Sequence, residues 1–401
     1  MIHQAIASAT EPEEMPQDDA GFLAVVRAFF HQALTPELRQ AGRETLGVHS
    51  DIGACKVWHR RLFERGWIAP AWPVAFGGTG WSARQRFLFD RECARQDAPV
   101  LFIGGIRSLG PLLIEQGTPE QRGRFLTPML SGRDLWCQGF SEPGAGSDLA
   151  AISTRAVRDG DSYVVNGSKI WTTGAHHANW MFAIVRTDDS GKRQQGLTFL
   201  LIDMTSPGLS VKPIIGLAGD HEFNQVFFDD VRVPVAQRIG AENDGWTMAK
   251  RLMQLARSNN TPAALVGRVL RRTAEAVVAA GDRLEPSVRM RLAGLMIELE
   301  AFEQLELSGF AAGPVRLGDQ ALPSMLKLTG SELHQRVAEL AMEVAGPQAA
   351  ATLEAIGLAG AALDDGAKAS AKHLCVRAAT IYSGTSETQR NVIAHQILAN
   401  Q

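Results

Sequence analysis

The first third of the chain has the spacing of apolar residues that is typical of helices. Between residues 20 and 33, apolar positions such as Phe22 and Val26 recur every three or four residues and would form one face. Further along, Thr118-Pro119-Glu120 combines a capping residue, a proline for the first helical position and an acid for the first turn. We therefore expect a helical N-terminal domain over residues 1–135.

The pattern changes to that of β-strands near Trp136. Residues 180–185 and 197–202 are apolar runs of strand length, and residues 226–233 continue in the same way up to Pro234. The dipeptide Asn166-Gly167 follows a short apolar run and favours a tight turn between two strands. This segment predicts a middle β domain over residues 136–240, with a hairpin turn at Asn166-Gly167.

The remainder of the chain again has helical periodicity. One apolar stripe contains Leu292, Leu295, Met296 and Leu299, and a second begins at Leu333. Helices, then strands, then helices is a block order, which argues against alternating strands and helices around one parallel sheet. We expect a mixed α and β fold of three domains, with residues 241–401 forming a C-terminal helical bundle.

Composition excludes several classes of protein. The 401 residues include 40 Lys and Arg against 43 Asp and Glu, so there is no electrostatic reason to expect nucleic acid or an anionic membrane as partner. No apolar run reaches the roughly 20 residues that span a bilayer, so no membrane insertion is expected. A cytoplasmic location is expected, because the N-terminus lacks a basic segment followed by an apolar one. The four cysteines are far apart, and no metal site is expected.

Two neighbouring segments in the β domain have residues suited to binding a flat, polar ligand. The segment from Gln138 to Asp148 is rich in Gly and Ser, which leaves backbone amides open to close approach. The second segment, residues 167–174, sets Trp171 beside Thr172 and Thr173, so that a π face adjoins two hydroxyl groups. Each segment alone could equally be an ordinary turn or a packing contact.

A third polar segment, residues 380–390, interrupts the C-terminal helical pattern. Its Ser-Gly-Thr-Ser sequence could present groups to a ligand, or Thr385 could simply cap a helix that continues through Thr388 and Gln389.

Taken together, the three segments resemble those of the acyl-CoA dehydrogenase family. Further resemblance is carried by residues 66–70, by residues 117–121, by residues 223–234 and by Gly245-Trp246. The resemblance implies an N-terminal helical domain, a middle β-barrel domain and a C-terminal four-helix bundle. It also implies FAD between the last two domains, in a homo- or hetero-oligomer that is a dimer or a tetramer. Acyl-CoA is the implied substrate, and an electron-transferring flavoprotein is a candidate electron acceptor.

The resemblance assigns binding roles to nine residues of this chain. Those implied to bind FAD are Gln138, Phe140, Ser141, Trp171 and Thr173 at the ring, with Thr385 and Glu387 at the adenylate end. Those implied to bind the acyl-CoA are Ser147 and Arg257.

This chain departs from the family at the catalytic base. The reaction removes an α-proton beside a thioester while a hydride leaves the β-carbon, and a carboxylate is the usual base. The family places that glutamate at one of two positions, which Ser383 and Ala256 occupy here. Neither residue can act as a carboxylate base, so the catalytic residue stays unassigned. A second departure is Glu343 with Gly346-Pro347, where the family has a Gln and a Gly-Gly pair. These variants resemble a bacterial branch of mixed two-subunit complexes, known from the breakdown of steroid and other ring-containing acyl-CoAs, in which one subunit can lack the base.

Three hypotheses remain open from the sequence. The chain could be a dehydrogenase subunit whose base comes from a partner or an unrecognised position, a flavin monooxygenase on the same scaffold, or a structural subunit without catalysis. His176-His177 is interpreted as a solvated turn, and His221-Glu222 as surface loop charge.

Overall fold

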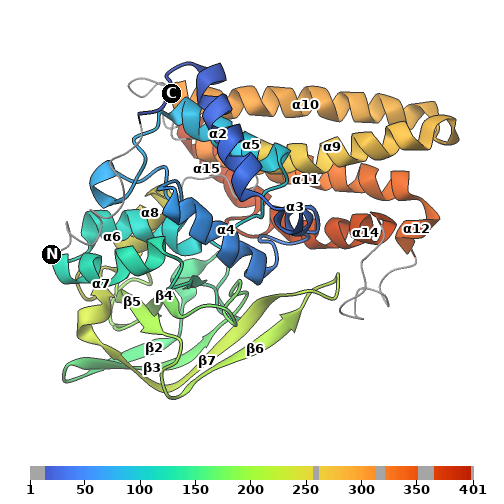
Figure 1. Ribbon diagram of the computed structural model, residues 1–401. Helices are drawn as coiled ribbons and strands as arrows, with labels where there is room; N and C mark the ends of the chain where they lie inside the picture. Colours follow the sequence, from blue (N-terminus) through green and yellow to red (C-terminus); the bar gives the residue numbers. More distant parts are fainter. Residues whose placement is uncertain (1–13, 256–261, 312–320, 351–364, 399–401) are drawn as a thin grey trace.

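The computed structural model describes residues 14–255, 262–311, 321–350 and 365–398. Helices of the N-terminal part lie against both the strands and one end of a long helical bundle (Figure 1). This arrangement confirms the three-part fold expected from the block order. No described helix is both long enough and apolar enough to cross a membrane.

The N-terminal helices pack around an aromatic core. Helix α2 buries Phe22, Val26 and Phe30 on one face, as the spacing predicted, and Trp58 and Trp81 complete the cluster. The helices of this part are α2 (Asp19–Ala33), α3 (Pro36–Arg43), α4 (Ile52–Glu64), α5 (Ala83–Arg95), α6 (Gly110–Gln116) and α7 (Pro119–Leu130).

Helix α7 begins as predicted and connects this part to the strands. Thr118 and Gln121 form a capping box, in which each side chain bonds the other residue's backbone N–H. The Gln121 side-chain amide also donates to the carbonyl oxygens of Ala236 and Arg238, at 2.9 and 2.8 Å. A helix-capping residue therefore also joins two domains.

The middle domain is an eight-stranded sheet in the order β6-β7-β3-β2-β4-β5-β8, with β1 paired in parallel to β4. Where the resemblance implied a barrel, the described strands pair along one open path that ends at β6 and β8. The strands are β1 (Trp136–Gly139), β2 (Arg155–Asp159), β3 (Ser162–Lys169), β4 (Trp180–Arg186), β5 (Leu197–Asp203), β6 (Leu209–Ile215), β7 (His221–Pro234) and β8 (Arg238–Ile239).

Strands β4 and β5 are buried on both faces, which explains their uninterrupted apolar runs. One face of β4 and β5, including Phe182 and Phe199, packs in the same core as the N-terminal helices. The other face, including Met181 and Leu200, forms a second core within the sheet.

The hairpin predicted at Asn166-Gly167 was wrong. Strand β3 runs through both residues, and its pairing with β7 shifts register between Val165 and Gly167. Gly167 has φ +138°, and a Cβ there would lie 2.8 Å from the Cα of Thr154. The dipeptide therefore forms a β-bulge, which needs the same backbone freedom as a turn. The actual turn lies at Gly160, between the paired ends of β2 and β3.

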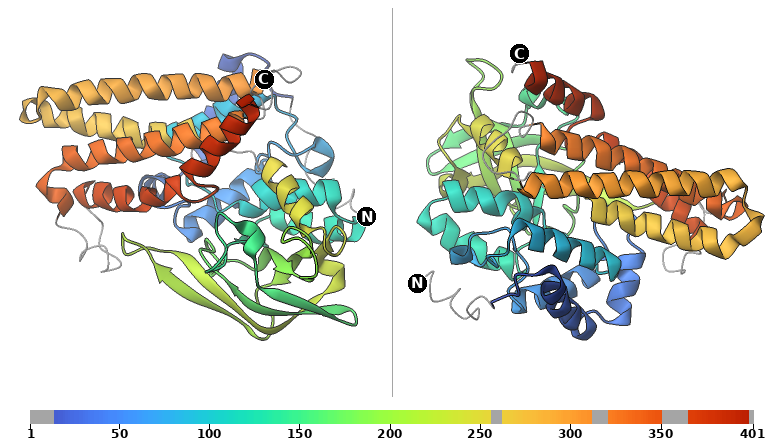
Figure 2. Two further views of the ribbon diagram at one scale, coloured as in Figure 1. Left: turned by 180° about the vertical axis from the view of Figure 1, so that it is seen from behind. Right: turned by 90° about the horizontal axis from the view of Figure 1, so that it is seen from above.

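The C-terminal part is a bundle in which α11 packs against α9, α10 and α14 (Figure 2). The predicted stripes fill its core with Leu292, Leu295, Leu333 and Val337, whereas Met296 was wrongly placed in the stripe and is 53% exposed. The helices are α8 (Gly245–Leu255), α9 (Ala263–Ala280), α10 (Pro286–Ala311), α11 (Leu322–Ala345), α12 (Pro347–Ala350), α14 (Asp365–Val376) and α15 (Ser386–Leu398).

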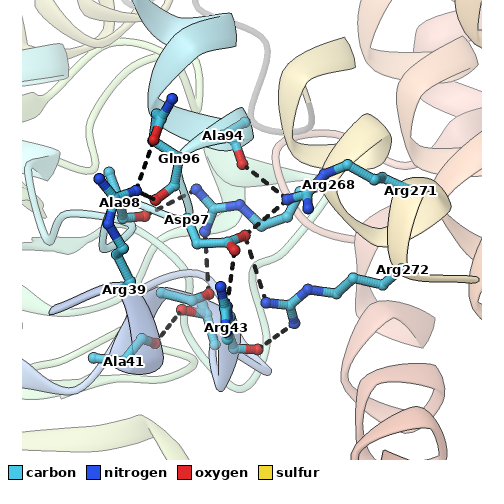
Figure 3. Close-up of polar contacts among 12 residues, drawn as sticks. Arg39, Ala41, Arg43, Ala94, Gln96, Asp97, Ala98, Arg268, Arg271 and Arg272 are labelled. Carbon is cyan, nitrogen blue, oxygen red and sulfur yellow. Dashed lines mark hydrogen bonds and ion pairs between the residues drawn. The ribbon is translucent and has the colours of Figure 1, made fainter. Parts of the chain in front are cut away.

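One buried carboxylate joins the N-terminal helices to the bundle. Asp97, which follows α5, accepts a hydrogen bond from Arg43 of α3 at 2.9 Å and another from Arg271 of α9 at 2.9 Å (Figure 3). Arg272 lies 3.5 Å from the same carboxylate. Beside it, the Arg268 guanidinium donates to the carbonyls of Gly42 and Ala98. Four arginines thus gather around one acid at this junction.

Candidate functional site

The two polar segments of the β domain lie side by side. The N–H of Ile170, next to Trp171, donates to the carbonyl of Ser141 at 2.9 Å. Strand β1, which leads into the first segment, pairs with β4, and β3, which leads into the second, pairs with β7. The two segments are therefore adjacent, and their accessible residues are Gln138 and Ser141 in the first and Ser168, Ile170, Trp171 and Thr173 in the second.

A buried ion pair between Lys169 and Glu142 anchors the first segment. The Lys169 ammonium donates to Glu142 Oε1 at 2.7 Å, to the Phe140 carbonyl at 3.3 Å and to the Ile184 carbonyl at 2.6 Å. The side chains of Lys169 and Glu142 are 0% and 3% exposed. This pair fixes the backbone of the loop, because the ammonium bonds both the loop's carbonyl and the acid that follows it.

Both carboxylate oxygens of Glu142 accept hydrogen bonds. Besides Lys169, it accepts from the N–H groups of Ser153 and Thr154, at 2.7 and 3.0 Å. Burial alone would raise the pKa of Glu142, but the charge of Lys169 and these hydrogen bonds outweigh it and lower the pKa. Our sequence reasoning gave no role to this pair, although both residues adjoin the polar segments.

Trp171 presents its indole to solvent from a strained backbone. Its φ is +58°, a left-handed value that is uncommon for a bulky residue, and its side chain is 58% exposed. Phe223 of β7 supports one edge of the indole, at a ring-centroid distance of 6.2 Å. An exposed aromatic face held in this way is suited to stacking a flat ligand.

The residues beside Trp171 divide between two faces. Thr173 is partly exposed, whereas Thr172 is buried and its hydroxyl has no partner within the described residues. Backbone hydrogen bonds from Thr172 to Asn224 and from Gly174 to Glu222 hold the strand end against β7. Of the two threonines, only Thr173 therefore shares the accessible face with the Trp171 indole.

The other β-domain residues that the resemblance implies differ in their exposure to solvent. Gln138 and Ser147 are exposed and Ser141 is partly exposed, so all three can reach a ligand. Phe140 cannot contact a ligand with its ring, which packs against Phe182 and Phe199 at 6.0 and 6.1 Å. Only its backbone is available.

The third polar segment begins helix α15 on the bundle. Thr385 Oγ1 accepts the N–H of Thr388 at 3.2 Å, which confirms the capping interpretation. Ser383 stands at one family position for the base, with φ +57°, and Glu387 is exposed in the first turn of α15. Ala256, at the other base position, and Arg257 lie outside the described residues.

The interpretation of Glu222 as surface charge was wrong. Its side chain is buried, and its carboxylate accepts the backbone N–H of Val48 at 2.5 Å from the N-terminal domain. Burial raises the pKa of Glu222. Nothing in the local sequence separates this acid from a loop residue, because its partner lies 174 residues away.

His176 and His177 belong to a cluster of imidazoles rather than to a simple solvated turn. The ring of His176 lies 3.9 Å from those of His177 and His221, and Asn224 bonds both His176 and His221. His49 completes the cluster from the N-terminal domain, at 6.3 Å from His177. Within the described residues, no group of three or more ligand-type side chains is arranged to hold a metal.

The cluster predicts an acid-sensitive strand end. Partial burial and the neighbouring imidazoles of His177 and His221 lower the pKa of His176 from 6.5 to about 4. The folded state therefore binds fewer protons than the unfolded state, and stability falls as the pH drops below 6.5. We expect His176→Gln to flatten the decline in urea midpoint between pH 7 and pH 5. His31→Gln, on the exposed face of α2, should leave the decline unchanged, and an unchanged decline in His176→Gln would contradict the assignment.

Comparison with known proteins identifies the family. The chain matches models of the N-terminal domain of acyl-CoA dehydrogenase over residues 16–133, the middle domain over residues 137–231 and the C-terminal domain over residues 243–398. It is 36% identical to acyl-CoA dehydrogenase IpdE1 of Mycobacterium tuberculosis, over 95% of this chain and 98% of that protein. It is also 36% identical to acyl-CoA dehydrogenase FadE26 of Mycobacterium tuberculosis, over 92% and 93% of the two chains.

Solved structures of acyl-CoA dehydrogenases have the same fold as this chain. The Tcur3481-Tcur3483 steroid ACAD has a TM-score of 0.81 and 29% identity, and covers 96% of this chain and 98% of its own. The ChsE4-ChsE5 complex from Mycobacterium tuberculosis has a TM-score of 0.78 and 30% identity with the same coverage. The chain therefore belongs to the acyl-CoA dehydrogenase family, whose members are FAD-dependent flavoprotein oxidoreductases.

Proposed function

We propose that this chain is the flavin-binding subunit of a heteromeric acyl-CoA dehydrogenase that introduces a Cα–Cβ double bond into an acyl-CoA. Two observations together carry the proposal. The segments of Ser141 and Trp171, which the family uses to bind flavin, lie side by side, and the position of the catalytic base holds a serine, Ser383. The first feature argues for retained cofactor binding, and the second argues that the chain does not complete the reaction alone.

The residues of the two adjacent segments fit a flavin. The Trp171 indole would stack on the flat ring, while Gln138, Ser141 and Thr173 would donate and accept hydrogen bonds at its polar edge. When bound, FAD supplies a hydride acceptor for the substrate β-carbon. Thr385 and Glu387 of the bundle would contact the adenylate end. Ser147 and Arg257 would bind the acyl-CoA.

The missing carboxylate determines what a partner must provide. A serine hydroxyl without an adjacent base is far too weak to remove an α-proton, so Ser383 does not take the role of the glutamate. A partner subunit would then supply the base and complete the site. Two similar structures carry paired names, ChsE4-ChsE5 and Tcur3481-Tcur3483, and the second is described as a steroid ACAD. We therefore propose a hetero-oligomer whose acyl-CoA carries a steroid or other ring system.

A structural subunit without catalysis is the second candidate, and Ser383 is the observation that favours it. The exposed and strained Trp171 opposes it, because a chain with no flavin has no need to keep an indole in that state.

Production of the chain alone and with candidate partner chains tests the proposal. We expect flavin absorbance in the complex, and anaerobic bleaching by a ring-containing acyl-CoA only when the partner is present. Trp171→Ala should weaken flavin binding about 5-fold to 150-fold and reduce bleaching accordingly, because stacking on one aromatic ring contributes about 1–3 kcal/mol. Val278→Ala, which alters an exposed apolar residue of α9, is the matched control.

The outcomes separate the hypotheses. Full bleaching in a Trp171→Ala complex would support the structural subunit, and a colourless complex would contradict flavin binding. Product that forms only with oxygen, and without bleaching by acyl-CoA, would indicate a monooxygenase instead.

A further inference from the structure

Trp171, whose left-handed backbone presents the indole to solvent, is flanked by hydrogen bonds on both sides. Before it, the N–H of Ile170 donates to the Ser141 carbonyl at 2.9 Å. After it, Asn224 of β7 bonds both polar groups of the Thr172 backbone. The Asn224 carbonyl accepts the N–H of Thr172 at 2.9 Å, and the Asn224 side-chain amide donates to the Thr172 carbonyl at 3.0 Å. A strained backbone persists only where its surroundings fix it, so these bonds hold the strand end in which Trp171 has φ +58°.

The Asn224 side chain is 0% exposed, and all of its polar groups are used. Besides the bond to Thr172, its amide nitrogen lies 3.0 Å from His176 Nδ1, and its oxygen lies 2.8 Å from His221 Nε2. The Thr172 carbonyl can only accept, so the amide nitrogen faces Thr172 and the oxygen faces His221. His221 must then donate from Nε2, and His176 must accept at Nδ1. The surroundings therefore fix the Asn224 amide as the donor to Thr172.

Packing of the two imidazoles keeps this arrangement in place. The rings of His176 and His221 stack at 3.9 Å with an interplanar angle of 18°, so each bonds Asn224 from a packed position. Partial burial and the neighbouring imidazoles lower the pKa of His176 to about 4, which leaves Nδ1 free to accept at neutral pH. The residue before Asn224 on β7, Phe223, contacts the edge of the Trp171 indole. Strand β7 therefore supports Trp171 twice, with Asn224 at its backbone and Phe223 at its ring.

We propose that Asn224 is a positioning residue of the flavin site: by bonding both sides of the Thr172 backbone, it holds Trp171 in the conformation that stacks on the flavin ring. Because Asn224 is completely buried, its effect on the ligand passes through Trp171. The inference rests on the proposed function for the identity of the ligand, whereas the hold on Trp171 does not depend on it.

Asn224→Asp is the test variant, and Gln225→Glu is its matched control. Asn224→Asp keeps the shape of the side chain but removes the donor to Thr172. Its carboxylate can accept from His221 and from a protonated His176, so we expect the chain to stay folded, which urea unfolding checks. Gln225→Glu makes the same change from amide to carboxylate at the next residue of β7. Asn224→Ala, which removes the donor without adding a charge, serves as a second variant and should behave as Asn224→Asp does.

In the complex with its partner, we expect Asn224→Asp to weaken FAD binding about 5-fold to 150-fold, because the flavin must then restore the strained backbone of Trp171. We also expect the FAD that stays bound to fluoresce more strongly than in wild type, since an indole stacked on the flavin quenches its emission. Gln225→Glu should change neither property. A residue with a purely structural role would lower stability and leave the fluorescence of bound flavin unchanged.

A measurement without flavin keeps the test independent of the proposed function. The eight tryptophans can be replaced by fluorotryptophan, and the fluorine NMR signal of Trp171 is identified by its loss in Trp171→Phe. We expect Asn224→Asp to shift this signal in the flavin-free complex and Gln225→Glu to leave it in place. Unchanged FAD affinity and fluorescence in Asn224→Asp would overturn the proposal, and so would an unshifted Trp171 signal. A wild-type complex that binds no FAD would contradict the proposed function instead, and the Trp171 signal would still test the role of Asn224.

Discussion

Lys169→Met is expected to destabilise the protein by about 3–5 kcal/mol and to abolish flavin retention, because it leaves the Glu142 carboxylate buried without its cation. The side chain of Glu142 is 3% exposed, so water cannot replace the lost charge. The loop would also lose the ammonium that bonds the Phe140 carbonyl. Urea unfolding measures the first effect, and absorbance of the purified complex measures the second.

A double variant separates stability from loop geometry. Lys169→Met combined with Glu142→Gln removes both charges, while the amide oxygen can still accept from the N–H groups of Ser153 and Thr154. We expect this variant to recover part of the lost stability, since no unpaired charge stays buried. Flavin binding should not recover, because the loop would still lack its anchor to the carbonyls of Phe140 and Ile184. Arg232→Met, which breaks an exposed pair with Asp159, should change stability by less than about 1 kcal/mol. Recovery of flavin in the double variant would contradict an anchoring role.

The sequence was informative wherever local physics decides the structure. The cap at Thr118, the apolar faces of α2 and α11 and the doubly buried strands β4 and β5 follow from periodicity and turn chemistry, and the structure confirms them. Asn166-Gly167 shows the limit of local reasoning. A dipeptide that favours positive φ fits a turn and a bulge equally well, and only pairing with β7 decides between them.

The site was harder to predict, because its supporting residues are far apart along the chain. Glu142 and Lys169 are 27 residues apart, and Glu222 bonds a backbone 174 residues away. No local pattern distinguishes these buried charges from surface ones. Phe140 illustrates the opposite limit: the resemblance implies a flavin contact, but its ring packs against Phe182 and Phe199 in the core and leaves only its backbone for that contact.

Substitution of Asp97 is expected to have the second large effect on stability, because this one acid neutralises several arginines where the N-terminal helices meet the bundle. Asp97 is 3% exposed, with φ +54°, and three arginines on α3 and α9 lie within 3.5 Å of its carboxylate. Arg268 adds a fourth positive charge nearby, and among the described residues its guanidinium donates to the backbone carbonyls of Gly42, Cys93 and Ala98. Without the acid, like charges on the N-terminal helices and the bundle would repel one another across the junction.

Asp97→Asn is expected to lower the free energy of unfolding by about 2–3 kcal/mol, the range for hydrogen bonds to charged groups, because the arginines are partly exposed and water screens them. Asparagine has the same shape and tolerates a left-handed backbone, so the change isolates the charge. Asp159→Asn, in an exposed pair, is the control and should cost less than about 1 kcal/mol. A loss as small as that of the control would show that the junction is held by packing alone.

The difference in unfolding free energy between wild type and Asp97→Asn should shrink in acid. Burial alone would raise the pKa of Asp97, but the Arg43 hydrogen bond and the charges of Arg271 and Arg272 outweigh it and hold the pKa below its ordinary value of 3.8. The stability that this carboxylate contributes is therefore complete above pH 3.8 and is lost as the pH falls through the lower folded value. The gap between wild type and Asp97→Asn should be constant from pH 7 to pH 5 and should close below pH 4. A gap that stays open in acid would mean that the substituted amide disrupts the turn itself, since a protonated Asp97 carries no more charge than an amide does.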